Sequence, residues 1–333
     1  MARLTRIATF SLLILLSQTV GCVIYPYRAE LEHRDTAAFD GVHKVAVETR
    51  NGAIEVQCDA QRKDVDIQSF RSANGLSEAD ARQIAEKIEI KVERDPGDAG
   101  LLHIAAKMPV VEMGRNQSAR FRIQLPPTAE LVLDTSNGRI TAGGCEKNVS
   151  ANTSNGRIAV ERCKGDVEAH TSNGHIVAND IAGNVDAQST NGGIDLTRVG
   201  KSSIKARTSN GRVRVVEASG EATVRSTNGS VEVRLKSTPP SPHIEVVTSN
   251  GHVELEVPRT VNAELDMNTS NGRVHADLQD VRISDLDSGR SRLRARLNDG
   301  GGTIDVQSSN GSLTLRAVGD APATTVKPAA SRS

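Results

Sequence analysis

The chain alternates apolar and polar residues, and the alternation breaks at regularly spaced Asn-Gly pairs. The pairs begin at Asn51, Asn137, Asn155, Asn173, Asn191, Asn210, Asn228, Asn250, Asn271 and Asn310. From Asn137 onward the successive spacings are 18, 18, 18, 19, 18, 22, 21 and 39 residues. Period-two alternation on both sides of a turn predicts strand, turn and strand. Asn and Gly tolerate the left-handed backbone of a tight corner, so they suit this turn.

Residues around the pairs recur at fixed positions, and this separates two all-β folds. Thr or Ser lies two residues before each Asn, with apolar residues four and six before it and three and five after it. One unit has Val149, Ala151, Thr153, Ile158 and Val160. A β-meander does not need the same inward residues in each hairpin, whereas stacked coils place like residues in ladders about 4.8 Å apart. We therefore predict a parallel β-helix, or solenoid, of about 18-residue coils with Asn-Gly corners.

The parity of the alternation predicts which side chains point inward. The aliphatic residues, the Thr or Ser and the Asn itself share one parity, so we expect polar ladders inside the solenoid. These include Thr153, Thr171, Asn155 and Asn173. The last spacing, of 39 residues, fits two coils, one of which has lost its motif near Ser288.

Five segments follow from these patterns. They are a signal peptide (1–21), a tether (22–40), a first coil with a small α+β N-terminal cap (41–130), the solenoid repeats (131–316) and a disordered tail (317–333). Within the cap, Ser77 precedes two acidic residues and starts a helix, and strands are expected at 88–92, 102–106 and 121–125. A cap would cover an open coil edge, which otherwise invites aggregation.

Composition and charge narrow the class of protein. Aromatic residues make up 2% of the 333 residues and Trp is absent, so a narrow aliphatic interior must replace the usual ring-filled core. Lys and Arg number 41, and Asp and Glu also number 41. A neutral chain without a basic tract disfavours nucleic-acid binding.

The N-terminus is typical of an exported protein. Arg3 and Arg6 precede an apolar run over residues 7–16, which is too short to span a bilayer as a helix. Residues 19–22 end in Gly21-Cys22 and resemble the lipobox of bacterial lipoproteins, although Thr19 replaces the usual Leu. This resemblance implies that Cys22 carries lipid and anchors the chain in the envelope, at the outer membrane or cell surface. A plain signal peptide with an incidental cysteine is the alternative.

The repeats themselves resemble a family. The units from Thr135-Ser136-Asn137-Gly138 to the one at Asn310, and the approach over residues 121–126, are similar to the putative-adhesin family of bacterial envelope β-solenoids. The resemblance covers about residues 41–316. It implies the fold and an envelope location, and the family is itself a domain of unknown function.

The repeat pattern does not bring together the acid, base or nucleophile side chains that catalysis needs. A sugar-cleaving β-helix needs clustered carboxylates or basic residues on a concave face, whereas these repeats have no fixed Asp or Glu ladder, as the position four after each Asn shows. It holds Glu55, Thr141, Ala159, Val177, Asp195, Arg214, Glu232 and Glu254. The eight His residues lack metal-ligand spacing. We predict a protein that is not an enzyme, with no cofactor, no metal and no small-molecule substrate.

One surface row is a candidate binding stripe. The position two after each Asn carries basic residues in most coils, namely Arg139, Arg157, His175, Arg212, His252 and Arg273. Stacked one strand spacing apart, they form a weakly basic edge. This edge either binds an anionic envelope polymer or a partner protein, or is a solvated corner that keeps the rod soluble.

The cysteines fall on one coil position. Cys145 and Cys163 each lie eight residues after their Asn, so adjacent coils bring their Cα atoms within the range that a disulfide accepts. A disulfide and two buried free thiols both fit this position. Cys58 stands apart in the first coil and is expected to be a free thiol.

Three functions remain open at this stage. The leading one is an adhesin-like binding or scaffold module of the cell envelope, whose partners are the membrane through its lipid and an envelope glycan or surface protein. The second is a structural or regulatory envelope lipoprotein that docks to a membrane partner. The third is a degenerate polysaccharide-active β-helix enzyme.

Overall fold

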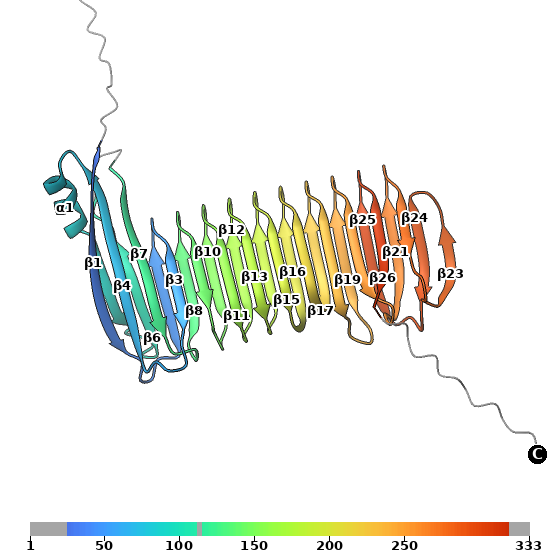
Figure 1. The fold of residues 1–333 in the computed structure, drawn as a ribbon, viewed down its shortest axis with the longest axis horizontal. Helices are drawn as coiled ribbons and strands as arrows, with labels where there is room; N and C mark the ends of the chain where they lie inside the picture. The colour runs from blue at the N-terminus through green and yellow to red at the C-terminus, as the bar shows by residue number, and fades with distance from the viewer. Residues whose placement is uncertain (1–24, 112–114, 320–333) are drawn as a thin grey trace, which may run out of the picture.

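The computed structural model describes residues 25–111 and 115–319, which form one elongated solenoid (Figure 1). The strands of its coils are β2 (Lys44–Thr49), β3 (Ile54–Cys58), β8 (Glu130–Thr135), β9 (Ile140–Gly143), β10 (Val149–Thr153), β11 (Ile158–Cys163), β12 (Val167–Thr171), β13 (Ile176–Ile181), β14 (Val185–Ser189), β15 (Ile194–Val199), β16 (Lys201–Thr208), β17 (Val213–Ser226), β18 (Val231–Ser237), β19 (His243–Thr248), β20 (Val253–Pro258), β21 (Ala263–Thr269), β22 (Val274–Asp277), β25 (Gly302–Ser308) and β26 (Leu313–Val318).

Further elements lie at the two ends of the rod (Figure 1). At the N-terminal end these are β1 (Tyr27–Ala38), β4 (Asp64–Gly75), α1 (Glu78–Glu86), β5 (Glu89–Arg94), β6 (Leu101–Lys107) and β7 (Gln117–Leu125). At the C-terminal end they are β23 (Ile283–Ser288) and β24 (Arg292–Leu297).

Each coil lies on the next in parallel register. Val149 of β10 is opposite Leu131 of β8 on one side and Val167 of β12 on the other. The second strands of the coils stack in the same way, with β11 between β9 and β13. The rod therefore has two faces, one built from the strand before each Asn-Gly corner and one from the strand after it. The predicted fold, a parallel β-solenoid with an α+β cap, is confirmed.

The interior is a thin aliphatic layer between the two faces. Ala151, Ile158 and Val160 are fully buried, at the positions that the alternation assigns to the core. Small and branched side chains fill this narrow space, and each buried Val or Ile contributes about 1.5–3 kcal/mol. Phe121 is the largest fully buried side chain. A thin interior of this kind explains why the chain has so few aromatic residues.

The corner differs from the predicted parity at one residue. Thr153 and Thr171 are buried as expected, each 8% exposed. The Asn side chains, by contrast, lie on the surface, and Asn155 Nδ2 donates to Asn137 Oδ1 across 2.7 Å. The chain bends between the Thr and the Asn, so the period-two rule stops at the Thr. The expectation that Asn155 and Asn173 stack inside is wrong, although the ladder itself exists.

Close packing of backbones, more than a left-handed φ, explains the glycine of each corner. A Cβ on Gly174 would meet the carbonyl oxygen of Gly156, in the preceding coil, at 1.7 Å. The left-handed residues lie elsewhere, seven positions after the Asn, where Arg162, Asp180 and Glu217 have φ of 53°, 57° and 53°. That second bend returns the chain to the other face.

The N-terminal cap extends both faces of the rod. β7 is parallel to β3 and antiparallel to β4, and β4 is antiparallel to β1. On the other face β6 is parallel to β2 and antiparallel to β5. α1 begins after Ser77, whose hydroxyl accepts a hydrogen bond from the Asp80 backbone N–H, as the sequence predicts. Much of the predicted tether is instead strand β1, which pairs with β4 along its full length.

The C-terminal end corrects the predicted coil order. β25 lies between β19 and β21, and Ile304 is opposite both Ile244 and Leu265. The last coil in sequence is therefore inserted before the coil of Asn271. The predicted extra coil near Ser288 is wrong, because β23 and β24 form an antiparallel hairpin that covers the edge of β21. A covered edge cannot recruit further strands there.

Candidate binding surface along the Asn-Gly corner

A continuous amide ladder runs along the corner. From Asn137 onward, each Asn donates its Nδ2–H to the Oδ1 of the Asn in the neighbouring coil, and Asn51 accepts the first bond. The bonds join Asn51, Asn137, Asn155, Asn173, Asn191, Asn210, Asn228, Asn250, Asn310 and Asn271 in that order, with lengths from 2.7 to 2.9 Å. Hydrogen bonds in such a chain polarise one another. The ladder fixes the spacing of everything beside it.

Beneath this ladder the buried hydroxyls tie coil to coil. Thr153 Oγ1 donates to the Gly138 carbonyl oxygen at 3.1 Å, and Thr171 Oγ1 donates to that of Gly156 at 3.1 Å. The bonding partners of these hydroxyls are backbone carbonyls and not the hydroxyls of neighbouring coils. Each one satisfies a backbone acceptor of the preceding coil, and buried polar groups need such a partner.

A shallow groove of about 870 Å³ runs beside the ladder, on the face built by the strands before the corner. It crosses successive coils from the one at Asn51 to the one at Asn250. Its middle row consists of the buried Thr and Ser hydroxyls. One outer row is a second hydroxyl series directly before each Asn, which comprises Ser136, Ser154, Ser172, Thr190, Ser209, Thr227 and Ser249. Except for Ser249, which is half-buried, these hydroxyls are exposed.

The other outer row of the groove changes charge along the rod. It begins with Glu48 and Asp134, continues through uncharged or weakly basic residues, and reaches Arg207 and Arg225 toward the far end. Asn152, His170 and Gln188 lie between. The sequence analysis does not predict this groove, because the basic residues that mark a binding edge lie after the corner and not before it. The signal was present, since the outward hydroxyl recurs directly before nearly every Asn.

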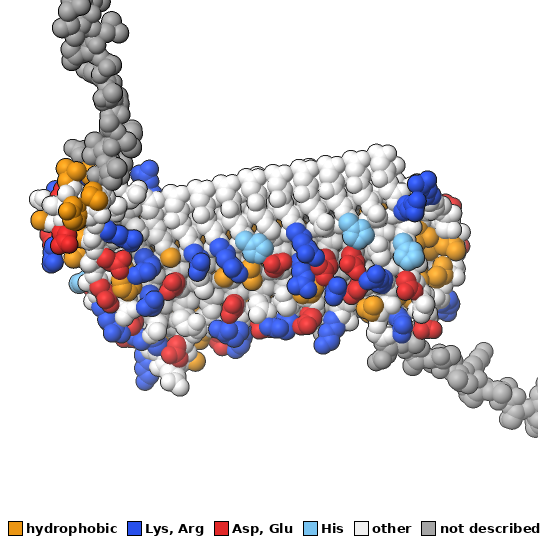
Figure 2. All heavy atoms as spheres, turned by 45° about the horizontal axis from the view of Figure 1, so that its top comes forward, with side chains coloured by type: hydrophobic (Ala, Val, Ile, Leu, Met, Phe, Trp, Pro, Cys, Tyr) orange, Lys and Arg blue, Asp and Glu red, His pale blue; other side chains and the backbone are white. Residues whose placement is uncertain are grey.

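The candidate stripe lies on the opposite side of the Asn ladder. Backbone hydrogen bonds stack its positions coil by coil, from Arg139 through Arg157 and His175 to His252. Figure 2 shows the arrangement as an uncharged band along the rod, with Lys, Arg and His side chains beside it. Arg273 comes last because its coil follows the inserted one. The structure therefore aligns the predicted residues, and their role in binding stays a prediction.

Carboxylates neutralise part of this stripe. His175 Nε2 lies 2.8 Å from Asp195 Oδ2. Arg212 Nη2 lies 2.6 Å from Glu232 Oε2, and the Glu232 side chain is only 9% exposed. Arg214 and Arg234 also contact that carboxylate, at 3.3 and 3.1 Å. The middle of the stripe is thus an ion-pair network rather than a free basic surface.

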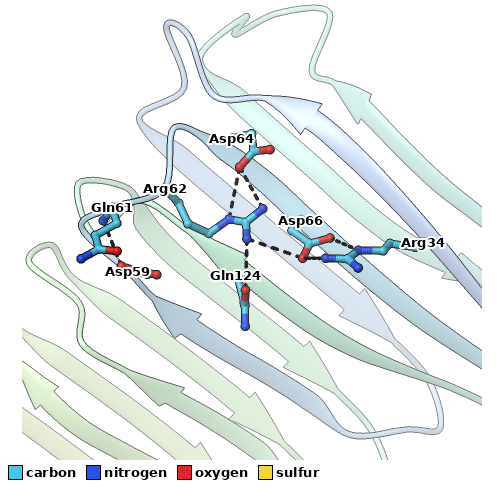
Figure 3. Close-up of polar contacts among 7 residues, drawn as sticks. All are labelled: Arg34, Asp59, Gln61, Arg62, Asp64, Asp66 and Gln124. Carbon is cyan, nitrogen blue, oxygen red and sulfur yellow. Dashed lines mark hydrogen bonds and ion pairs between the residues drawn. The ribbon is translucent and has the colours of Figure 1, made fainter.

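A second charge cluster fastens β1 to the cap (Figure 3). Asp66 is nearly buried and accepts hydrogen bonds from Nε and Nη2 of Arg34, both at 2.7 Å. Arg62 lies 3.7 Å from the same carboxylate, contacts Asp64 at 2.9 Å, and donates to Gln124 at 3.1 Å. The Arg34 guanidinium holds the pKa of Asp66 below its usual value.

Ion pairing or backbone hydrogen bonding accounts for the shifted carboxyl groups of the described chain. The pKa of Asp80 is lowered by the Leu76 backbone N–H and by Arg115, and that of Asp180 by Arg198. Lowered values keep a carboxylate ionised, whereas a general acid needs a raised value. Residues 25–111 and 115–319 also hold no group of three His, Cys, Asp or Glu that could bind a metal ion.

The cysteines form a ladder of three rather than two. Cys145 and Cys163 occupy the shared buried position, as predicted, and all three described thiols are free. Cys58 does not stand apart, since its Sγ lies 3.1 Å from Cys145 Sγ. The insert of the cap loops out, so the first coil stacks directly on the coil of Cys145. The Cys145 thiol and burial raise the pKa of Cys163. A hydrogen bond with Cys163 lowers the pKa of Cys145, but the Cys58 thiol and burial outweigh it and raise that pKa. The Cys145–Cys163 disulfide stays a prediction.

The proposed lipid site, Cys22, and the tail beyond Gly319 lie outside the described residues. Within the described part of the chain, no helix has the length and hydrophobicity to cross a bilayer.

Fold and surface together define a two-faced parallel β-solenoid whose corner carries uncharged polar ladders. Residues 182–316 match the family described as Toastrack DUF4097, and this match confirms the resemblance to a domain of unknown function that the repeats indicated. No curated protein matches the chain.

Two solved structures are similar to the chain at low identity. A putative cell adhesion protein from Clostridium sporogenes is 14% identical, with 87% of this chain and 100% of that chain covered and a TM-score of 0.25. A putative adhesin from Bacteroides fragilis is 12% identical, with 89% and 100% covered and a TM-score of 0.32.

Proposed function

We propose that this protein is an exported, lipid-anchored module of the bacterial cell envelope that binds an extended glycan along the groove and performs no catalysis. The observation that carries the proposal is the groove itself, in which the same two hydroxyl rows recur over successive coils. An open, repetitive trough fits a linear polymer with a repeating unit better than a compact substrate, which prefers an enclosed pocket.

The chemistry of the groove favours a hydroxyl-rich ligand. The exposed Ser and Thr hydroxyls both donate and accept, and they are repeated at the strand spacing of about 4.8 Å. Each such hydrogen bond contributes only about 0.5–1.5 kcal/mol, so affinity depends on contact with several coils at once. No aromatic residue lines the groove, which makes hydrogen bonding, not ring stacking, the source of recognition.

A paired set of variants tests the groove. The first double variant, Ser154→Lys with Ser172→Lys, places two long charged side chains in the groove. The control, Thr141→Lys with Thr197→Lys, places two such side chains on the other face of the rod, outside the groove. On an array of envelope glycans, the first pair should lose binding and the second should retain it. Equal binding by both pairs contradicts the proposal. In a pulldown from detergent-solubilised envelope, retention of a single membrane protein and no glycan would instead favour a regulatory lipoprotein.

The anchor has its own test. Cys22→Ser in the full chain should move the protein from the membrane fraction to a soluble exported fraction, because the acyl chains would be lost. Identical partitioning of variant and parent would exclude the lipid anchor without touching the groove.

A further inference from the structure

Exposed large hydrophobic side chains of the described chain are confined to the two ends of the rod. Tyr27, Leu76 and Val110 are 47%, 57% and 103% exposed at the capped end. Ile283, Leu286 and Val318 form the corresponding set at the far end. Figure 2 shows the two main gatherings of hydrophobic side chains at these ends. The wall of the rod between them is therefore not an apolar interface.

The three residues at the capped end share one corner of the cap, which we call the cap corner. Tyr27 is opposite Gly75 in the β1–β4 pair, and Leu76 follows Gly75 directly. The Asn74 backbone N–H donates to the Asn116 carbonyl. Next to Asn116, the Gln117 side chain donates to the carbonyl of Pro109, the residue before Val110. The adjacent ends of β1 and β4, and the segment before β7 that includes Val110, thus lie at the same corner of the cap.

This corner is also where the described chain begins. Tyr25 is the first described residue, and Cys22 is three residues earlier in the sequence. Three residues span at most about 10 Å when fully extended. A lipid on Cys22 would therefore hold the cap corner within that distance of the bilayer surface. Tyrosine with exposed aliphatic neighbours is the composition that settles at the headgroup level.

We propose that Tyr27, Leu76 and Val110 contact the lipid surface and orient the anchored rod on the membrane. The inference rests on the proposed lipid anchor. Three side chains bury too little area to bind a membrane alone, since interfacial affinity scales with buried apolar area. Tethering changes this, because the corner meets the bilayer at a high effective concentration. The far end, with Ile283 and Leu286, then stays away from the lipid.

The lack of Trp provides a direct probe. Tyr27→Trp creates a single fluorophore at the cap corner, and Leu286→Trp creates one at the far end with similar exposure. The chain from Cys22 onward can be coupled through that thiol to a maleimide lipid in phosphatidylcholine vesicles. Cys58, Cys145 and Cys163 are buried, so the coupling is selective.

Brominated phosphatidylcholine quenches tryptophan that touches lipid. We expect Tyr27→Trp to lose fluorescence severalfold in brominated vesicles, and Leu286→Trp to be unchanged. Adding Leu76→Ser and Val110→Ser to Tyr27→Trp should remove much of the quenching. Equal quenching at the two positions overturns the inference. So does emission from Tyr27→Trp that is already blue-shifted before vesicles are added and is not quenched by brominated lipid, because the tryptophan would then be buried in protein. Because the attachment is chemical, the result does not depend on whether the cell lipidates Cys22.

Discussion

Removing the charge of Asp66 should loosen β1 and leave the coils unaffected. β1 is an edge strand whose described side chains are all at least partly exposed, and it pairs only with β4. Its attachment relies on the backbone ladder, on the packing of Leu31 and Ala37 against buried residues, and on side-chain contacts, of which the one between Arg34 and Asp66 has a nearly buried carboxylate. Asp66→Asn keeps the shape of the side chain, so the change isolates the charge.

The magnitude follows from the geometry of the pair. Hydrogen bonds to charged groups contribute about 1.5–3 kcal/mol. The Asp66 side chain is only 5% exposed, but its partner is 61% exposed, which places the loss in the lower part of that range, about 2 kcal/mol. A loss of that size raises the population of the opened strand about 30-fold.

Amide hydrogen exchange resolves this effect by segment. Exchange in β1 should become about 30-fold faster in Asp66→Asn, while exchange in a central strand such as β14 stays at the parent rate. Asp64→Asn is the matched control, since Asp64 is half exposed and contacts Arg62 instead. Unchanged exchange in β1, or equal acceleration in all strands, would refute the reasoning.

Acid should reproduce the effect in the parent protein. The Arg34 hydrogen bonds lower the pKa of Asp66 from its ordinary value of 3.8. A carboxyl group whose pKa is lower in the folded state stabilises that state fully when the pH is above the ordinary pKa. The contribution is lost as the pH falls through the lowered pKa. Protection of β1, corrected for intrinsic exchange, should therefore fall below about pH 4. Asp66→Asn should lack this acid-dependent part.

Two further predictions concern the repeat itself. Gly174→Ala should lower the free energy of unfolding by about 2–3 kcal/mol, measured by denaturant titration, since its Cβ would meet backbone at 1.7 Å. Gly193→Ala should cost less, because its Cβ would meet the movable His175 ring at 2.9 Å and backbone only at 3.2 Å. Equal losses would count against backbone crowding. Cys145→Ser should abolish any disulfide, because Cys58 and Cys163 are two coils, about 10 Å, apart. Thiol labelling of the denatured, unreduced protein checks this, and a remaining bridge would contradict the stacking order.

The sequence was sufficient for the architecture because the solenoid repeats one local rule. Alternation assigns Val149, Ala151 and Thr153 to the core, and the structure buries all three. The shared coil position of Cys145 and Cys163 followed from the same count. Such predictions succeed because each depends on neighbouring residues and on stacking by one strand spacing.

Other features depend on geometry that no local pattern contains. The bend between Thr153 and Asn155 reverses the parity, and only the path of the corner reveals it. The 39-residue spacing fits either an extra coil or an insertion, and pairing of β25 with both β19 and β21 decides between them. β1 alternates apolar and polar residues only over 27–32, so the strand form of its polar second half reflects pairing with β4. The contact of Cys58 with Cys145 likewise needed the insert to loop out.

The division between fixed and variable rows indicates where specificity can reside. The Thr or Ser, the Asn and the Gly of each corner hold adjacent coils together, and a change at any of them disturbs the stack. The side chains of the outward row that runs from Glu48 to Arg225 face the groove, and the link between coils that this row does make is the contact of Arg225 with Glu245. Charge can therefore vary there at little cost in stability. The graded charge of this row would let a groove of identical hydroxyls distinguish the two directions of a bound polymer.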